Sequence, residues 1–261
     1  MTPFAATLRA EWSKLVSLRS TKILLALTVL LGVGLTALVA WVAGATFDNW
    51  DAAGRNEFEP IGTAMIGAIL SAILLLVLGV KAATAEYRSG MIRLTLTATP
   101  RRRRVLGAKA AVVAALSLVA GLVLTIGMFL VAQAIFASYG MPSASLADGD
   151  ALRAVIGNGV LAVQFPVMAM ALGIVLRSTS GAVLGIFAII FGPPFLGGLL
   201  PAWYGEHVVK YLPGAASDAI AMGHLEGVAE GLSPVIAALV VVAWLAVFLA
   251  GAWIVLERRD A

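Results

Sequence analysis

The chain has 261 residues, of which 61% are hydrophobic and only 12% are charged. A soluble domain of this length would carry about a quarter charged residues, so this much apolar surface calls for a bilayer rather than a soluble core. The absence of cysteine excludes a disulfide framework, thiol catalysis and a Cys-ligated metal site.

Residues 1–22 are expected to form an amphipathic helix that lies along the membrane surface. Their apolar side chains recur at spacings of four and three and form one stripe: Phe4, Leu8, Trp12, Leu15 and Leu18. Arg9, Lys14 and Arg19 interrupt the segment with positive charge. A basic helix with aromatic residues on its apolar side is typical of an interfacial location.

Six apolar runs follow, and each is long enough to cross the hydrocarbon, which takes about 20 residues. The predicted fold class is therefore an all-α integral membrane protein, with residues 23–261 as a six-helix transmembrane domain. In the fifth run, Gly192-Pro193-Pro194 removes backbone donors and is expected to kink or unwind the helix. The predicted spans are residues 23–45, 61–80, 110–138, 152–176, 181–200 and 235–256.

The distribution of Lys and Arg predicts the orientation. One side holds 15 of the 18 basic residues, and the other side holds Arg55, Arg153 and Lys210. The positive-inside rule then places both termini in the cytoplasm of a multi-pass protein of the plasma (inner) membrane. Because the basic residues lie at the ends of apolar runs, membrane lipid is an expected partner and nucleic acid is not.

The predicted outer loop 201–234 contains a segment, 214–225, that is apolar enough for a short helix. Such a helix would dip into the outer leaflet or rest on it. The alternative is a solvated loop, which the Gly and Pro content of the segment would also fit.

The sequence argues against several kinds of chemistry. No ionisable side chain lies deep in any run, which argues against proton relays and ion-coupled carriers. No Ser has a helical His or Lys within reach, and no phosphate-binding loop is present, so we expect no catalytic, cofactor-binding or metal-binding residue in this chain. The helical amides either bond between helices or line a substrate path: Gln133, Asn158 and Gln164.

The loop 81–109 holds eight basic residues against one acid, Glu86. A short helix is expected over 83–96, with Gly90 as a break. The run 101–104 consists of four arginines, which anchor the third span and hold anionic lipid headgroups in the simplest interpretation. That interpretation leaves the rest of the loop unexplained, and a crosswise helix could instead dock into a groove on a soluble partner.

Three segments of the chain resemble ABC-2 type transporter permeases. The first begins with Glu86-Tyr87-Arg88-Ser89-Gly90-Met91 and continues through Leu94, Leu96, Pro100-Arg101-Arg102 and Lys109. The others are 176–182 between the fourth and fifth spans and Tyr211-Leu212-Pro213-Gly214 outside. The chain departs from the family pattern at Met91, where Thr is usual, and in its dense arginine run.

The resemblance implies an ABC-2 (type V exporter-like) transmembrane domain that pairs with a second permease chain, identical or sister. Separate ABC ATP-binding subunits would bind and hydrolyse ATP, and this chain would not be an enzyme. The implied ATPase-coupling interface consists of Glu86, Tyr87, Arg88, Gly90, Met91, Arg93 and Arg177. The absence of charge in the spans favours a hydrophobic or amphiphilic cargo. The alternative function is a membrane anchor or assembly subunit that binds a soluble partner and transports nothing.

Overall fold

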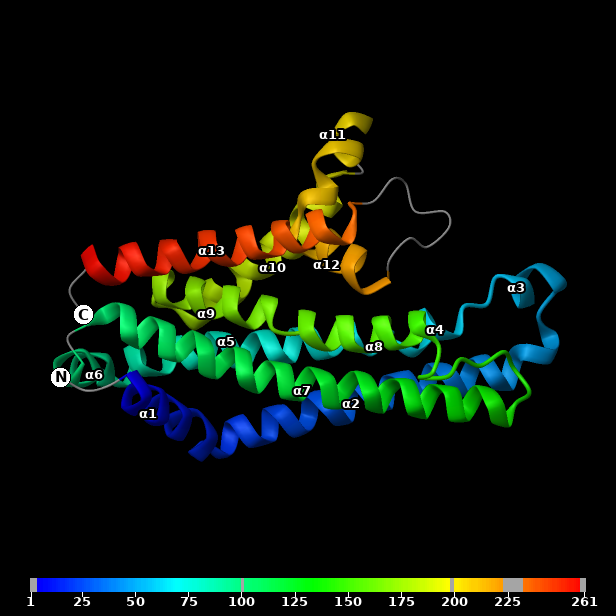
Figure 1. The fold of residues 1–261 in the computed structure, drawn as a ribbon, viewed down its shortest axis with the longest axis horizontal. Coiled ribbons are helices and arrows are strands. Elements are labelled where there is room, and N and C mark those ends of the chain that lie inside the picture. The colour runs from blue at the N-terminus through cyan, green and yellow to red at the C-terminus, as the bar shows by residue number, and fades with distance from the viewer. Residues whose placement is uncertain (1–3, 100, 198–199, 223–231, 259–261) are drawn as a thin grey trace.

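The computed structural model describes residues 4–99, 101–197, 200–222 and 232–258, and within these ranges every regular element is a helix. The α-helices are α1 (Phe4–Ser17), α2 (Arg19–Thr46), α3 (Ala52–Asn56), α4 (Pro60–Ala64), α5 (Ala68–Ser89), α6 (Met91–Ala98), α7 (Arg102–Ser138), α8 (Gly149–Leu161), α9 (Gln164–Leu176), α10 (Thr179–Gly197), α11 (Ala202–His207), α12 (Pro213–Met222) and α13 (Pro234–Arg258). Figure 1 shows the long helices side by side along the long axis of the molecule. The all-α prediction is confirmed.

Five of the predicted runs form helices that are long and apolar enough to cross a membrane. They are Arg19–Asn49, Ala68–Arg88, Arg102–Ser138, Gly149–Leu176 and Pro234–Arg258. The remaining run, predicted at 181–200, forms α10, whose apolar stretch Thr179–Pro193 is shorter than the other five. The chain is therefore a membrane protein with five candidate spans and a shorter sixth apolar helix.

The N-terminal helix is separate from the first span, as predicted, but the boundary lies earlier than residue 22. Leu18 has an extended backbone, with φ −72° and ψ 122°, between the end of α1 and the start of α2. Figure 1 shows α1 inclined to α2 at this point. Leu15 is buried in the same core cluster as residues of α5, α7 and α9. The buried residues of α1 are Thr7, Glu11 and Leu15, whereas Phe4, Trp12 and Leu18 of the predicted stripe are exposed.

The fourth predicted run is one candidate span, but it is divided into α8 and α9 at Ala162-Val163. Pro166 explains the division, because a proline has no N–H to donate and its ring clashes with the carbonyl four residues earlier, here that of Ala162. The break also brings α9 very close to α5. A Cβ on Gly79 would lie 1.9 Å from the Pro166 carbonyl oxygen, so only glycine fits at this crossing.

The second predicted run is divided in a similar way, into α4 and α5 at residues 65–67. Thr36 of α2 bridges the division, because its hydroxyl donates to the Ala64 carbonyl at 3.3 Å and accepts from the Gly67 N–H at 3.2 Å. A side-chain hydroxyl thus satisfies backbone groups that the interrupted helix leaves unpaired at membrane depth.

The expected unwinding of the fifth run is not observed. Helix α10 continues through Gly192, Pro193 and Pro194 to Gly197. Each proline loses a hydrogen bond and crowds the carbonyl four residues earlier, but neighbouring turns can still keep the helical path.

The short helix predicted in the loop 201–234 is present as α12, and it packs against α8 and α13. Ala216 and Ala221 are fully or almost fully buried, so a solvated loop is ruled out for this segment. Residues 223–225, the end of the predicted helix, lie outside the described ranges.

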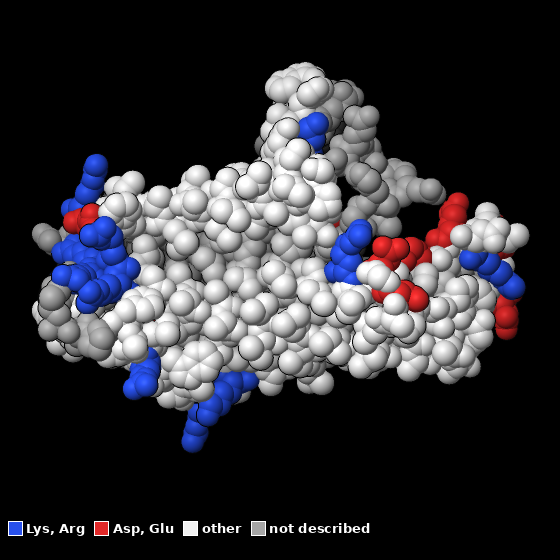
Figure 2. Space-filling model, in the orientation of Figure 1, with Lys and Arg blue, Asp and Glu red and all other residues white. Residues whose placement is uncertain are grey.

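Charge separates along the long axis of the bundle. Figure 2 shows most of the visible Lys and Arg at the end where α6 lies, and most of the visible Asp and Glu at the opposite end. Helix α1 begins, and α13 ends, at the α6 end as well (Figure 1). The structure therefore gathers at one end the segments that the sequence predicts to be cytoplasmic.

Candidate functional site

The site begins with a sharp turn at the α6 end of the bundle. Helix α5 continues past the apolar run to Ser89, and α6 starts at Met91 in a new direction. Gly90 between them has φ +71°, a left-handed conformation that glycine adopts without steric penalty. In Figure 1, α6 is seen almost end-on, so it crosses the bundle axis. The predicted break at Gly90 is confirmed, while Pro100 lies outside the described residues.

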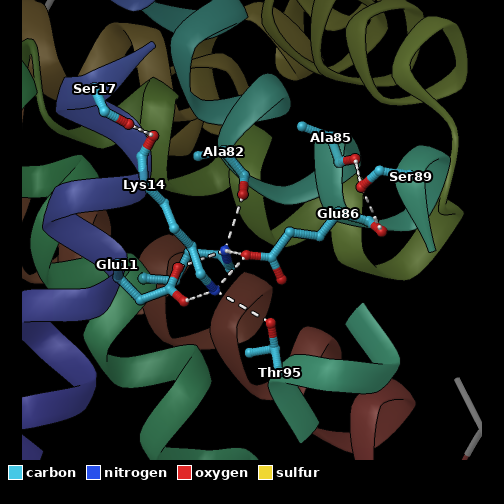
Figure 3. A network of polar contacts seen from close by, with 9 residues as sticks. Glu11, Lys14, Ser17, Ala82, Ala85, Glu86, Ser89 and Thr95 are labelled. Atoms are coloured by element: carbon cyan, nitrogen blue, oxygen red, sulfur yellow. Dashed lines mark hydrogen bonds and ion pairs between the residues drawn. The ribbon is translucent and has the colours of Figure 1, made fainter. Parts of the chain in front are cut away.

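Beneath this turn, four charged side chains form a buried network that joins three helices. Glu11 and Lys14 come from α1, Glu86 comes from the last turns of α5, and Lys109 comes from α7. Figure 3 shows the α1 side chains pointing toward Glu86. Glu11, Glu86 and Lys109 are all below a tenth exposed, so the network is largely closed to solvent.

Each ammonium in this network bridges the two carboxylates. Lys109 Nζ lies 2.6 Å from Glu11 Oε2 and 3.1 Å from Glu86 Oε1. Lys14 Nζ lies 2.6 Å from Glu11 Oε1 and 2.8 Å from Glu86 Oε1. Two positive and two negative charges offset one another, which is the condition under which buried ionised groups are tolerated.

The network also reaches the backbone of α5 and the crosswise helix. Lys109 Nζ donates to the Ala82 carbonyl at 3.0 Å, and Lys14 Nζ donates to the Thr95 hydroxyl of α6 at 3.2 Å. Burial lowers the pKa of the Lys14 ammonium, but hydrogen bonds to Glu11 and Glu86 outweigh it and hold that pKa above its ordinary value. Lys14 therefore stays charged at physiological pH and links α1 to α6.

A second arrangement forms on the surface beside the network, which we call the elbow groove. It is a cleft of about 660 Å³ between the α5–α6 turn and the turn that joins α9 to α10. Its lining residues are Thr84, Tyr87, Arg88, Gly90, Ile92, Arg93, Arg177 and Thr179. Among these described lining residues there are three arginines and no acid, so the groove carries positive charge.

Two contacts attach the α9–α10 turn to α5. The guanidinium carbon of Arg177 lies 5.3 Å from the centre of the Tyr87 ring, a cation–π distance. The hydroxyls of Thr84 and Thr179 are 2.8 Å apart. Arg177 has φ +51°, which is uncommon for a residue with a side chain, so surrounding contacts must hold it there.

Residues 66–261 match the protein family described as "Protein of unknown function (DUF2705)". The match covers all of α5 to α13 and therefore most of the chain. The chain belongs to the DUF2705 family. The comparison with curated proteins finds no match.

The DUF2705 match covers two of the four residues of the buried network. Glu86 and Lys109 lie within the matched residues, whereas Glu11 and Lys14 precede them. The elbow groove lies entirely within the match.

The structure brings together most of the residues predicted as a coupling interface. Five of them line the elbow groove: Tyr87, Arg88, Gly90, Arg93 and Arg177. Met91 lies on α6 next to the groove and is 46% exposed. Glu86 differs, because its carboxylate is buried in the network rather than presented to a partner. Its Oε2 has no hydrogen-bond partner among the described residues.

The helical amides predicted as pathway or interhelical groups are used for bonds within the chain. Gln133 joins α7 to the Pro60 carbonyl at 3.0 Å and to the Ala144 N–H at 2.8 Å. Gln164 of α9 accepts from the Ser217 hydroxyl and donates to the Pro213 carbonyl at 3.3 Å, which ties α12 to the break in the fourth run. Asn158 donates within α8, to the Ala154 carbonyl at 2.8 Å.

The sequence prediction missed Glu11 and Lys14 as parts of the site. A signal was available, because Glu11 lies three residues after Leu8 and four before Leu15 and so interrupts the apolar stripe of α1. An acid on the buried face of a helix needs a cationic partner. Leu94 of α6, named only as part of the resembling segment, is 69% exposed.

Proposed function

We propose that this DUF2705 chain is the membrane-spanning permease subunit of an ATP-driven ABC-2 exporter. In this proposal the chain has six spans, with α10 as the fifth, and both termini lie in the cytoplasm of the plasma membrane. ATP is bound and hydrolysed by a separate ABC ATP-binding subunit, and a second permease chain completes the translocation pathway. The observation that carries the proposal is the elbow groove, where the resembling segments before α6 and after α9 meet on one basic surface.

The chemistry of this surface indicates what the ATP-binding subunit presents to it. Arg88, Arg93 and Arg177 line the groove, and Met91 and Leu94 stand exposed beside it. A complementary surface carries carboxylates around an apolar pocket, so that charge guides the approach and apolar burial supplies affinity. The positive charge also raises the rate of association with an acidic partner.

Motion of α6 can reach the spans through the buried network. Thr95 of α6 contacts Lys14, and the ion pairs continue to Glu86 of α5 and Lys109 of α7. A partner that binds one position of α6 more tightly than another would therefore bias the packing of α1, α5 and α7 together. This coupling is the role that we assign to Glu86, in place of direct contact with the partner.

Because the chain contains no cysteine, a single introduced thiol is a specific probe of the docking surface. We expect Met91→Cys, labelled with a maleimide-linked benzophenone, to form a photo-cross-link with a co-expressed ATP-binding subunit in membranes. Trp203→Cys is the matched control, because Trp203 is also exposed, at 59%, but belongs to α11.

Cross-linking from Met91 and not from Trp203 would support docking at the elbow groove. If neither position cross-links while the two proteins still purify together, docking occurs elsewhere and the assignment of the groove is wrong. If the ATP-binding subunit does not associate with the chain at all, the anchor or assembly function is favoured over transport.

A further inference from the structure

A second basic cleft lies at the α6 end, where α7 begins and α13 ends. Its volume is about 950 Å³, and its lining residues are Phe4, Arg101, Arg102, Arg103, Arg104 and Glu257. Four guanidinium groups face one carboxylate, so the cleft is strongly positive. We call it the arginine cleft. None of its residues lines the elbow groove or belongs to the buried network.

Contacts of Arg102 and Arg103 with α13 help to hold the arginine cleft in shape. Arg102 donates to the Leu256 carbonyl, and to the Glu257 carbonyl at 3.3 Å, so it caps the last turn of α13. The guanidinium carbon of Arg103 lies 5.8 Å from the centre of the Trp253 ring. Helix α7 begins at Arg102, and its N-terminal dipole adds positive potential at the same place.

The surroundings of the arginine cleft are apolar and aromatic. Phe4 lines it and is 47% exposed, while Trp253 and Ile254 on the adjoining turn of α13 are 37% and 46% exposed. A charged cleft that adjoins exposed aromatic and aliphatic side chains on a spanning helix is typical of the membrane interface. A ligand with a phosphate headgroup and an acyl chain would place the phosphate in the charged cleft and the chain against the exposed apolar side chains.

We propose that the arginine cleft binds the phosphate groups of an anionic phospholipid. Arg is suited to this ligand, because its planar guanidinium donates two parallel hydrogen bonds to phosphate oxygens. Four positive charges against one negative charge leave an excess that more than one phosphate can neutralise, so cardiolipin, with two phosphates, binds more tightly than phosphatidylglycerol. An acidic protein surface would match the charge, but it would leave the exposed aromatic side chains without a partner.

The experiment compares lipid adducts by native mass spectrometry of the delipidated full chain in detergent. The added lipids are cardiolipin, phosphatidylglycerol and phosphatidylcholine. The test variant is Arg101→Gln/Arg103→Gln/Arg104→Gln, which keeps Arg102 as the cap of α13. The control variant, Arg9→Gln/Arg19→Gln/Lys22→Gln, removes the same number of positive charges, all exposed, from the segments near this end but none from the cleft.

We expect cardiolipin adducts on the wild-type chain and on the control, and about a tenfold weaker affinity in the cleft variant, with phosphatidylcholine unaffected. Equal cardiolipin binding by the cleft variant and the control would overturn the proposal. Inorganic pyrophosphate added alone distinguishes a lipid headgroup from a soluble phosphate. If it binds to the cleft as tightly as cardiolipin, the cleft is a site for a soluble ligand and the lipid proposal is wrong. Monodisperse elution and an unchanged melting temperature establish that the cleft variant is folded.

Discussion

At the scale of single residues, Lys109 is the more deeply buried of the two lysines that contact both Glu11 and Glu86. It is 4% exposed, and its ammonium lies within 3.1 Å of Glu11 and Glu86. A buried ion pair contributes little net stability, because desolvation offsets the attraction between the charges. Removing one member is different, since the remaining charge is left buried without compensation.

We therefore expect Lys109→Met to destabilise the protein by about 3–5 kcal/mol, as measured by unfolding in detergent. The double variant Lys109→Met/Glu86→Gln is expected to recover part of this loss, because the remaining ammonium, Lys14, then faces one carboxylate, Glu11, instead of two. If the destabilisation of the double variant equals the sum of those of Lys109→Met and Glu86→Gln measured singly, the two residues are not coupled.

The raised pKa of Lys14 predicts how the docking of α1 depends on pH. A cation whose pKa is higher in the folded state contributes stability that is fully present below the unfolded pKa, about 10.4, and is lost as pH rises through the folded pKa. Protection of α1 from protease should therefore be constant between about pH 7 and 9. In Lys14→Gln, α1 should be more readily cleaved across that whole range. If protection of α1 in the wild-type chain changed steeply between pH 7 and 9, the assignment of Lys14 as the charged group that holds α1 would be contradicted.

At the residue level, the sequence could name exposed basic residues but not their buried neighbours. The fold places Arg88, Arg93 and Arg177 on one groove, and their role in coupling stays a prediction. Glu86 was expected to face a partner, and it faces Lys14 and Lys109 instead. Its neighbours come from α1 and α7, and periodicity within one loop contains no information about which distant helices approach it.

At the scale of the helices, the crossing of α5 and α9 leaves no room for a side chain at Gly79. A Cβ on Gly79 would overlap the Pro166 carbonyl, which belongs to the backbone and cannot rotate away. We expect Gly79→Ala to force α5 and α9 apart and to lower stability by about 1–3 kcal/mol or more, measured as a fall in melting temperature.

The control for Gly79→Ala is Gly34→Ala in α2, where an added Cβ meets no described atom within 4 Å. Alanine has the higher helix propensity, so this control should leave stability unchanged or slightly higher. Equal effects of the two substitutions would show that the α5–α9 crossing is looser than described.

The length of the apolar runs was a good guide to which segments are helical and a poor guide to where the helices break. The runs 61–80 and 152–176 are continuous by composition, yet the chain divides them at residues 65–67 and at Ala162-Val163. The second division was predictable from Pro166. The first depends on the Thr36 hydroxyl of another helix, which the local sequence does not show.

Across the whole molecule, the two basic surfaces have separate places and separate assignments. The elbow groove lies between the α5–α6 and α9–α10 turns, and the arginine cleft lies between the starts of α1 and α7 and the end of α13. Composition and the positions of Lys and Arg were sufficient to predict a helical membrane protein with its basic segments at one end. The α5–α6 turn and the α9–α10 turn are nearly 90 residues apart, and only the fold could place them on one groove.

The central claim is that this chain couples to an ATP-binding subunit, and native mass determination of the complex tests it most directly. The chain is co-expressed with the candidate ATP-binding subunit, purified in mild detergent and assayed for ATP hydrolysis. The proposal predicts a complex of two permease chains and two ATP-binding subunits that hydrolyses ATP. Recovery of the chain without an ATP-binding subunit, under conditions that preserve a known exporter, would contradict it.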